Sequence, residues 1–159
     1  MPTASTAIDV RYCLDTNILV YAADTGAGDR HGRASLILSR LPETGGVITL
    51  QSLGEFFRVQ VYKRKLPVPT ARRWIDALRQ STTIVAADEA CLAAAMEAVE
   101  DHRWSFWDAM IWATARKAGC RLLLTEDGQD GRTLGGVTLV NPFLPNPSPL
   151  LVEALGPFP

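Results

Sequence analysis

RYCLDTNILVYA, residues 11–22, is a short run of β-favouring residues that ends on an acid and continues into an apolar segment. It predicts a buried strand whose C-terminal end presents the carboxylate of Asp15. In parallel α/β sheets, ligands bind beyond the carboxyl ends of the strands, where loops and helix N-termini converge. A carboxylate in such surroundings requires a cation, hydrogen-bond donors or a proton. Further acids that lie at the same carboxyl edge of the sheet would therefore form a ligand-binding site with Asp15.

The rest of the chain alternates between strand and helix patterns. A helical pattern over Arg33–Leu41, a Gly-Gly turn and the apolar run Val47–Leu50 complete a βαβ unit, which implies parallel strands. Later segments continue the alternation. Further strands are predicted at 82–87, 121–124 and 136–143, and helices at about 51–63, 89–102 and 106–117. The pattern predicts an α/β fold with a central parallel sheet.

Three more acids are expected at the carboxyl edge of this sheet. Glu55 and Asp108 lie in the first turns of helices, and Asp127 follows the buried run Arg121–Leu124. Each helix acid also has a purely structural interpretation, because Ser52-x-x-Glu55 and Ser105-x-x-Asp108 fit helix-capping patterns. For a single acid, capping is the more economical interpretation. Four acids at one edge instead indicate a site.

Four carboxylates without nitrogen or sulfur ligands favour hard divalent cations such as Mg²⁺ or Mn²⁺. Neither His31 nor His102 has a partner at metal-ligand spacing. One or two such ions would allow hydrolysis of a nucleic-acid phosphodiester. In this hypothesis Asp15 is the shared ligand and Asp127 serves a second ion or orients water. Glu126 and Asp130 are alternatives for that fourth position. Possible phosphate contacts are Thr16, Asn17 and Thr125.

Composition limits the partners. The chain has 159 residues with 47% hydrophobic residues, which suits one well-packed domain, and its net charge of −1 gives no global attraction for a polyanion. The local cluster Lys63, Arg64 and Lys65 begins the most basic segment. This segment is either a solvated helix face or a phosphate-contacting rim for RNA.

Three scattered cysteines and the absence of an apolar leader or membrane-length run predict a cytoplasmic protein that does not contact the membrane.

The motifs together resemble a known family. CLD15TNIL, LGE55F, FWD108A, LTED127GQDG and VNPF, which ends at Phe143, are similar in order and spacing to the motif series of PIN-domain proteins, and most similar to VapC-type ribonuclease toxins. The resemblance implies a three-layer α/β/α fold with the first strand central, and a Mg²⁺- or Mn²⁺-dependent endoribonuclease. It also implies a homodimer inhibited by a small DNA-binding antitoxin. We expect a flexible N-terminus (1–9), a PIN domain (10–143) and a Pro-rich tail (144–159) that acts as a docking or dimer-contact appendage.

Other functions remain open at this point. A phosphatase of the haloacid-dehalogenase kind needs a second acid two residues after the first, where this chain has Asn17. A receiver-like phospho-acceptor would not need Glu55 and Asp108 on helices. A catalytically silent binding module would use the acids only as helix caps. RNA cleavage by the wild type with Mg²⁺, with EDTA, and by Asp15→Asn separates these alternatives.

Overall fold

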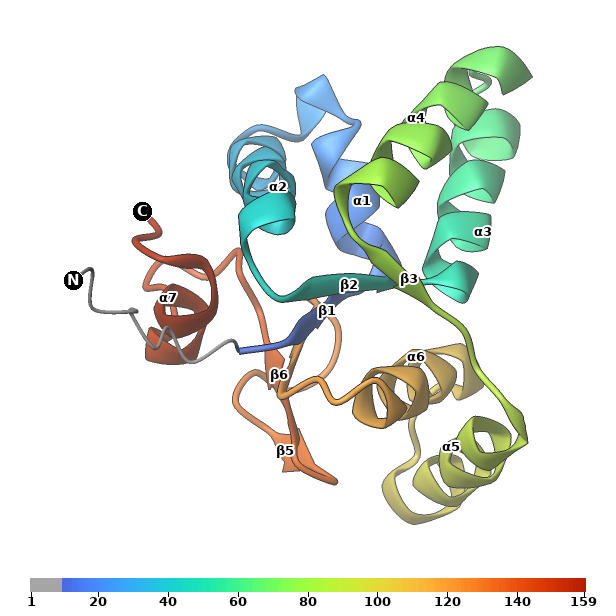
Figure 1. Cartoon of the computed structure of the whole chain (residues 1–159), viewed down its shortest axis with the longest axis vertical. Coiled ribbons are helices and arrows are strands. Elements are labelled where there is room, and N and C mark those ends of the chain that lie inside the picture. The colour runs from blue at the N-terminus through green and yellow to red at the C-terminus, as the bar shows by residue number, and fades with distance from the viewer. Residues whose placement is uncertain (1–9) are drawn as a thin grey trace, which may run out of the picture.

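The computed structural model describes residues 10–159 and has three layers, with helices on both faces of one sheet (Figure 1). The sheet has six strands in the order β3-β2-β1-β4-β6-β5, so the first strand lies inside the sheet, as predicted. All neighbouring strands pair in parallel except β5 and β6. The strands are β1 (Tyr12–Leu14), β2 (Gly46–Thr49), β3 (Thr83–Val85), β4 (Leu122–Leu124), β5 (Thr133–Leu134) and β6 (Val137–Val140). The α/β class and its parallel core are confirmed.

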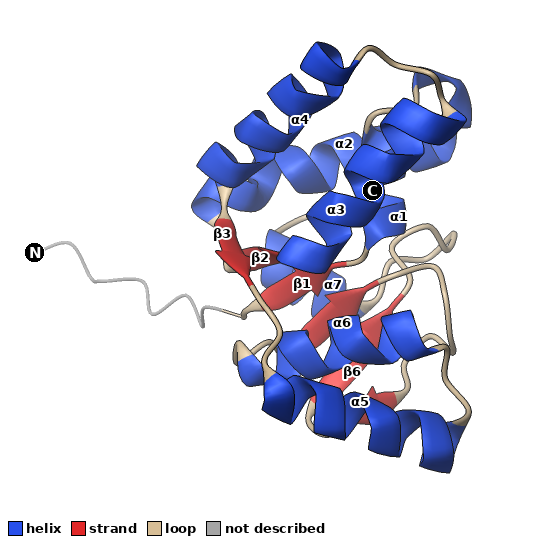
Figure 2. Cartoon of the chain, turned by 90° about the vertical axis from the view of Figure 1, so that its right-hand side faces the viewer, coloured by secondary structure: helices blue, strands red, loops and turns tan. Residues whose placement is uncertain are grey.

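The helices divide between the two faces of the sheet. Figures 1 and 2 show α1, α2, α3 and α4 on one face and α5 and α6 on the other. The α-helices are α1 (Thr16–Ala22), α2 (Asp29–Arg40), α3 (Leu50–Arg58), α4 (Val68–Ser81), α5 (Glu89–His102), α6 (Phe106–Lys117) and α7 (Pro149–Leu155). Short helical segments are η1 (Thr25–Ala27), η2 (Leu41–Glu43) and the π-helix η3 (Val59–Lys63), which directly continues α3.

Two apolar clusters hold the layers together, one on each face of the sheet. Successive side chains of a strand point to opposite faces. Accordingly, Tyr12 and Leu14 of β1 belong to the cluster that includes residues of α1 to α4, whereas Cys13 belongs to the cluster of α5 and α6. All three side chains are fully buried. A strand apolar on both faces is typical of a parallel sheet covered by helices.

Two helices begin earlier than the sequence predicts. Gly28 has φ of +62° and ψ of −129°, a conformation that favours glycine, and α2 starts directly after it at Asp29 rather than at Arg33. α3 starts at Leu50, because the Thr49 hydroxyl accepts a hydrogen bond from the Ser52 amide at 3.0 Å. The predicted capping box of Ser52 and Glu55 is therefore wrong, since Thr49 is the cap of this helix.

The segment after Phe143 packs against the body of the protein. Leu151 and Leu155 of α7, followed by Phe158, are buried in the same apolar cluster as β1 and α1. These side chains stabilise this chain's own core, so they are not available for the docking or dimer contacts expected of the tail. The predicted flexible N-terminus, residues 1–9, lies outside the described residues. None of the helices in residues 10–159 has the length and apolarity needed to cross a bilayer.

Candidate active site

Asp15 lies between the end of β1 and the start of α1. Its main-chain amide donates to the Leu124 carbonyl at 2.9 Å, which continues the pairing of β1 with β4 by one residue. Its side chain caps α1 by accepting from the Thr16 amide at 2.7 Å. Only 6% of the residue is exposed. The carboxylate is therefore fixed in place at the carboxyl edge of the sheet.

Thr125 links Asp15 to the loop after β4. Its hydroxyl donates to Asp15 Oδ2 at 2.7 Å and accepts from the Asp127 amide at 3.0 Å. The Thr125 amide in turn donates to the Val140 carbonyl of β6 at 3.0 Å. This buried threonine therefore places Asp127 beside Asp15, although more than a hundred residues separate the two acids in the chain.

Asp108 reaches the same position from α6. The cap of this helix is Ser105, whose Oγ accepts from the Asp108 amide at 3.3 Å. The capping interpretation of Ser105 is therefore confirmed. The cap uses the Asp108 main chain, and hydrogen bonding between the Ser105 and Asp108 side chains offsets part of the rise in the pKa of the Asp108 carboxyl. One carboxylate oxygen from each of Asp15, Asp108 and Asp127 lies within 4.8 Å of the others.

The cluster is electrostatically costly in its ionised form. Burial raises the pKa of Asp15 to about 6, with smaller contributions from the negative charges of Asp108 and Asp127; the hydrogen bonds from Thr125 and Thr16 lower it. Burial also raises the pKa of Asp108, again with contributions from neighbouring carboxylates. Without a counter-charge, part of the cluster would take up protons near neutral pH.

Glu55 lies beside the cluster but outside its closest group. Its Oε2 accepts from the Thr16 hydroxyl at 2.6 Å, and its Oε1 accepts from Gln51 Nε2 at 2.8 Å. The same Gln51 nitrogen donates to the Trp107 carbonyl at 3.1 Å, so Gln51 connects α3 to α6. The charge of Glu55 contributes to the raised pKa of Asp108. Thr16 holds Glu55 in this structure, and a phosphate contact by Thr16 stays a prediction.

The donor set fits a hard divalent cation. The converging ligands are carboxylate oxygens, with no nitrogen or sulfur atom in the group. Asn17 adds an amide beside them: its Nδ2 donates to Asp127 Oδ2 at 3.3 Å, while its buried Oδ1 has no hydrogen-bond partner in the described part of the chain. An acceptor left unpaired next to three acids is suited to a cation or its water. Asp15, Asp108 and Asp127, with Glu55 nearby, are the residues that would hold Mg²⁺ or Mn²⁺.

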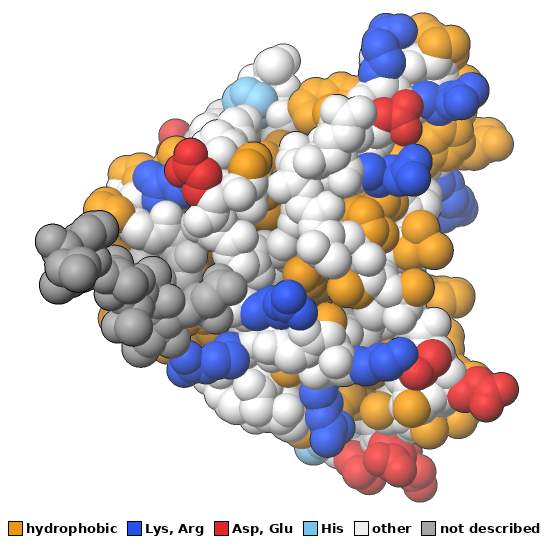
Figure 3. Space-filling model, viewed as in Figure 1, with side chains coloured by type: hydrophobic (Ala, Val, Ile, Leu, Met, Phe, Trp, Pro, Cys, Tyr) orange, Lys and Arg blue, Asp and Glu red, His pale blue; other side chains and the backbone are white. Residues whose placement is uncertain are grey.

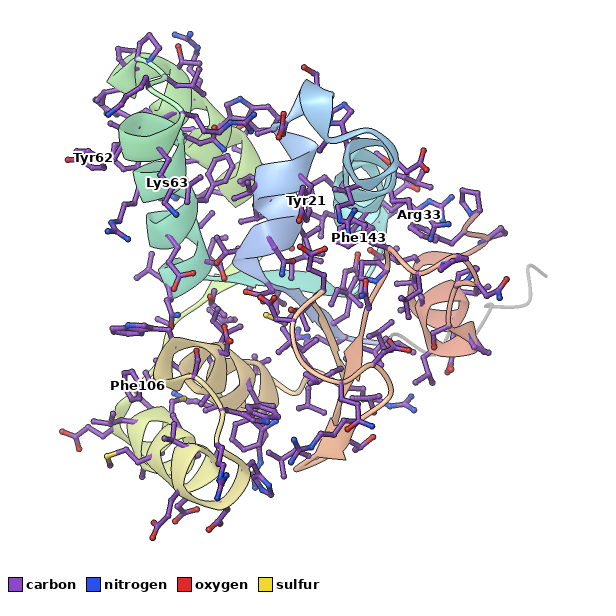
Figure 4. All side chains as sticks on the ribbon, turned by 180° about the vertical axis from the view of Figure 1, so that it is seen from behind. Tyr21, Arg33, Tyr62, Lys63, Phe106 and Phe143 are labelled. Carbon is purple, nitrogen blue, oxygen red and sulfur yellow. The ribbon has the colours of Figure 1, made fainter. Side chains whose placement is uncertain are left out.

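Two alternatives for the fourth acid are engaged elsewhere. Glu126 accepts from the Tyr21 hydroxyl and forms an ion pair with Arg30 at 2.9 Å. Figure 4 shows Tyr21 beside Phe143, and their rings meet edge to face at 5.2 Å. Asp130 Oδ1 accepts from the main chain of Asn141 at 2.8 Å. Asp127 is therefore the acid of this loop that joins the cluster.

The basic segment lies apart from the acids. Lys63 lies on η3 in the arm formed with α3 and α4, whereas Phe106 lies at the start of α6 in the opposite half (Figure 4). Arg64 pairs with Asp24 at 2.6 Å. Lys63, Arg64 and Lys65 do not line the pocket that contains the acids, so phosphate contact by these residues stays a prediction.

That pocket contains two residues that no sequence motif indicated. Besides Asp15 and its neighbours, it is lined by Arg103 and Trp104, which form the short connection between α5 and α6. Their position directly before the Ser105 cap is the only sequence signal that could have identified them.

Comparisons with known proteins agree with this fold. No curated protein matches the sequence, but solved structures share the fold. VapC20 of Mycobacterium tuberculosis, described as a sarcin-ricin loop cleaving toxin, is 21% identical with a TM-score of 0.59 over 70% of this chain and 86% of that chain. A toxin–antitoxin complex from Klebsiella pneumoniae is 24% identical (TM-score 0.61; 82% and 97% covered). VapBC2 from Rickettsia felis, bound to a DNA fragment from its promoter, is 19% identical (TM-score 0.58; 82% and 97% covered).

The family assignment rests on the sequence itself. The model of the PIN domain matches residues 12–130, which extend from β1 to the loop before β5 and include all four predicted site acids. PIN proteins are nucleases that typically use divalent metals. By this match over most of its length, the chain belongs to the PIN domain family.

Proposed function

We propose that this protein is a Mg²⁺- or Mn²⁺-dependent endoribonuclease that acts as the toxin of a toxin–antitoxin pair. The observation that supports it best is the convergence of Asp15, Asp108 and Asp127 from three distant segments to within 4.8 Å. Membership of a nuclease family supports hydrolysis, and the toxins among the structural neighbours support RNA as the substrate.

Each acid has a distinct part in this proposal. Asp15 is the shared ligand, because Thr16 and Thr125 fix both of its carboxylate oxygens. Asp108 and Glu55 complete the first ion site from the helix side, and Asp127 serves a second ion or orients a water. Bound Mg²⁺ or Mn²⁺ would supply the positive charge and water activation that phosphodiester hydrolysis needs.

The competing interpretation, a silent module with helix-capping acids, loses support at two positions. Thr49 caps α3 and Ser105 caps α6, so the carboxylates of Glu55 and Asp108 are not needed as caps. Acids brought together without a capping role, such as Asp108 beside Glu55 and Asp127, would only weaken a module that binds no cation.

The partner proposal follows from the neighbours. The Klebsiella pneumoniae and Rickettsia felis structures are complexes of toxin with antitoxin, and the latter contains promoter DNA. We infer a small DNA-binding antitoxin as partner of this chain. The homodimer implied by the family resemblance stays a prediction.

Cleavage of single-stranded RNA tests the proposal. The wild type should cleave with Mg²⁺ or Mn²⁺, and should fail to cleave in EDTA; Asp15→Asn should not cleave with either ion. Asp76→Asn, which changes an exposed acid on α4, is the matched control and should cleave like the wild type. The proposed site would be contradicted if cleavage were equal in three reactions: the wild type with metal, the wild type in EDTA, and Asp15→Asn with metal.

A further inference from the structure

The pocket beside the acids is larger than a metal site requires. It encloses about 240 Å³, whereas one water needs roughly 10–15 Å³ on the same measure. The acids form one edge of this pocket. The remainder is largely apolar and is lined by Trp104, Ile111, Leu123 and Leu139. We call this apolar part the recess.

Water is a poor occupant of the recess. A bound water needs two to four polar partners, which leucine and isoleucine side chains do not provide. An apolar pocket with a few convergent polar groups is the usual form of a site for an organic ligand. The occupant should therefore combine an apolar, ring-sized part in the recess with an anionic part at the acids and their cation.

Trp104 gives the recess a rigid aromatic wall. Its ring meets Trp112 edge to face with centroids 5.6 Å apart, and the Arg132 guanidinium lies 5.5 Å from its centroid. Arg132 is held in turn by a hydrogen bond of 2.9 Å to His102. The ring is therefore fixed from two sides, which lowers the entropy cost of stacking a ligand on it.

Among residues 10–159, Arg103 is the one basic residue that lines the pocket. It follows α5 with φ of +55°, a left-handed conformation in which glycine is the usual residue at a helix end. Its side chain makes no ion pair or hydrogen bond within residues 10–159. An arginine kept in a strained position without a protein partner is available to a ligand.

We propose that the recess binds one unstacked nucleobase next to the scissile phosphate, with Trp104 as its stacking wall and Arg103 as its polar contact. The inference rests on the proposed nuclease function and adds a specificity determinant to it. Protein recognition of single-stranded RNA commonly uses bases splayed out onto aromatic rings or arginine planes. The consequence is a preference for single-stranded or looped RNA, and for particular bases at one position beside the cut.

A randomised single-stranded RNA tests the preference directly. Sequencing the ends cut by the wild type should show selection at one position adjacent to the cleaved bond. Trp104→Leu, which keeps an apolar wall but removes the stacking ring, should cleave with that selection lost. Arg103→Gly should weaken the selection without lowering the thermal midpoint, since glycine suits the left-handed backbone. Arg79→Gln removes the same charge from the exposed surface of α4 and should keep the wild-type selection.

An abasic substrate then measures the contribution of the base. Replacing the selected nucleotide by an abasic one should lower the wild-type kcat/KM about 10- to 100-fold, the range expected for one stacked base. Trp104→Leu should cleave the two substrates at nearly equal rates. If the wild type cleaves both equally while Asp15→Asn cleaves neither, the recess proposal is overturned and the nuclease proposal stands.

A binding measurement keeps the two proposals separable when no RNA is cleaved. With 2-aminopurine in a short single-stranded RNA and Mg²⁺ present, occupancy of the recess should quench its fluorescence. Quenching by the wild type and not by Trp104→Leu supports the recess, whether or not cleavage follows. Absence of quenching by the wild type at every position of the probe overturns it.

Discussion

Asp15→Asn should stabilise the metal-free protein at neutral pH, although it should abolish activity. The pKa of Asp15 rises from 3.8 to about 6, chiefly through burial. Its folded-state pKa is above the unfolded-state value, so its contribution to stability is complete below pH 3.8 and is lost as the pH rises through about 6. Above that window the ionised carboxylate costs about 3 kcal/mol.

Asparagine removes this cost and keeps the shape of the side chain. Its side-chain oxygen can still accept from the Thr16 amide. The amide nitrogen that replaces Oδ2 cannot accept from the Thr125 hydroxyl. Losing that hydrogen bond costs about 1 kcal/mol, which leaves a net gain of about 2 kcal/mol. For a chain of this size, the thermal midpoint in EDTA should rise by about 4–8 °C.

The assay is thermal unfolding in EDTA across the window from pH 3.8 to above 6. As the pH rises through this range, the ionisation of Asp15 should lower the thermal midpoint of the wild type. Asp15→Asn should lack this decrease, and Asp76→Asn should show it like the wild type. Adding Mg²⁺ or Mn²⁺ should raise the wild-type midpoint by ligand linkage and leave that of Asp15→Asn nearly unchanged. A clear fall in the metal-free midpoint of Asp15→Asn at neutral pH would refute the reasoning and indicate that capping of α1 is the main role of Asp15.

Three further predictions concern other residues. Asp108→Asn should abolish RNA cleavage but leave the metal-free midpoint unchanged or raised, because it removes a carboxylate whose pKa is raised by burial; a large loss of stability in unfolding experiments would contradict this. Asp127→Asn should weaken Mn²⁺ binding measured by calorimetry, whereas Glu126→Gln at the next position should not, because Glu126 is engaged by Tyr21 and Arg30. Leu151→Ala should lower the free energy of unfolding by about 2–5 kcal/mol in urea titration, because this side chain of α7 is fully buried; a loss below 1 kcal/mol would show that the end of the chain is dispensable for the core.

The sequence predicted the fold class and the order of the main elements because these depend on local patterns. Buried parallel strands appear as short continuous apolar runs, and α5 begins and ends at the residues that its alanine-rich pattern indicates. Helix starts were less predictable. The cap of α3 is Thr49 rather than Ser52, because several hydroxyl residues in succession can each cap a helix and the local pattern does not choose among them.

For the site too, some features follow from the sequence and others only from the tertiary structure. The sequence by itself determined that Asp15 and Asp127 follow strand ends and that Asp108 lies at a helix start, since the carboxyl ends of parallel strands share one edge of a sheet. Glu55 lies one turn further into its helix than predicted, because α3 starts at Leu50. Only the tertiary structure decided that Asp15, Asp108 and Asp127 form the close group, that Thr16 holds Glu55 beside it, and that Glu126 is committed to Tyr21 and Arg30. The tertiary structure also decided that the recess exists and that Arg103 and Trp104 line the pocket to which it belongs. The physical reason is that hydrogen bonds and packing between distant segments fix where a side chain points, and local sequence patterns contain no record of such contacts.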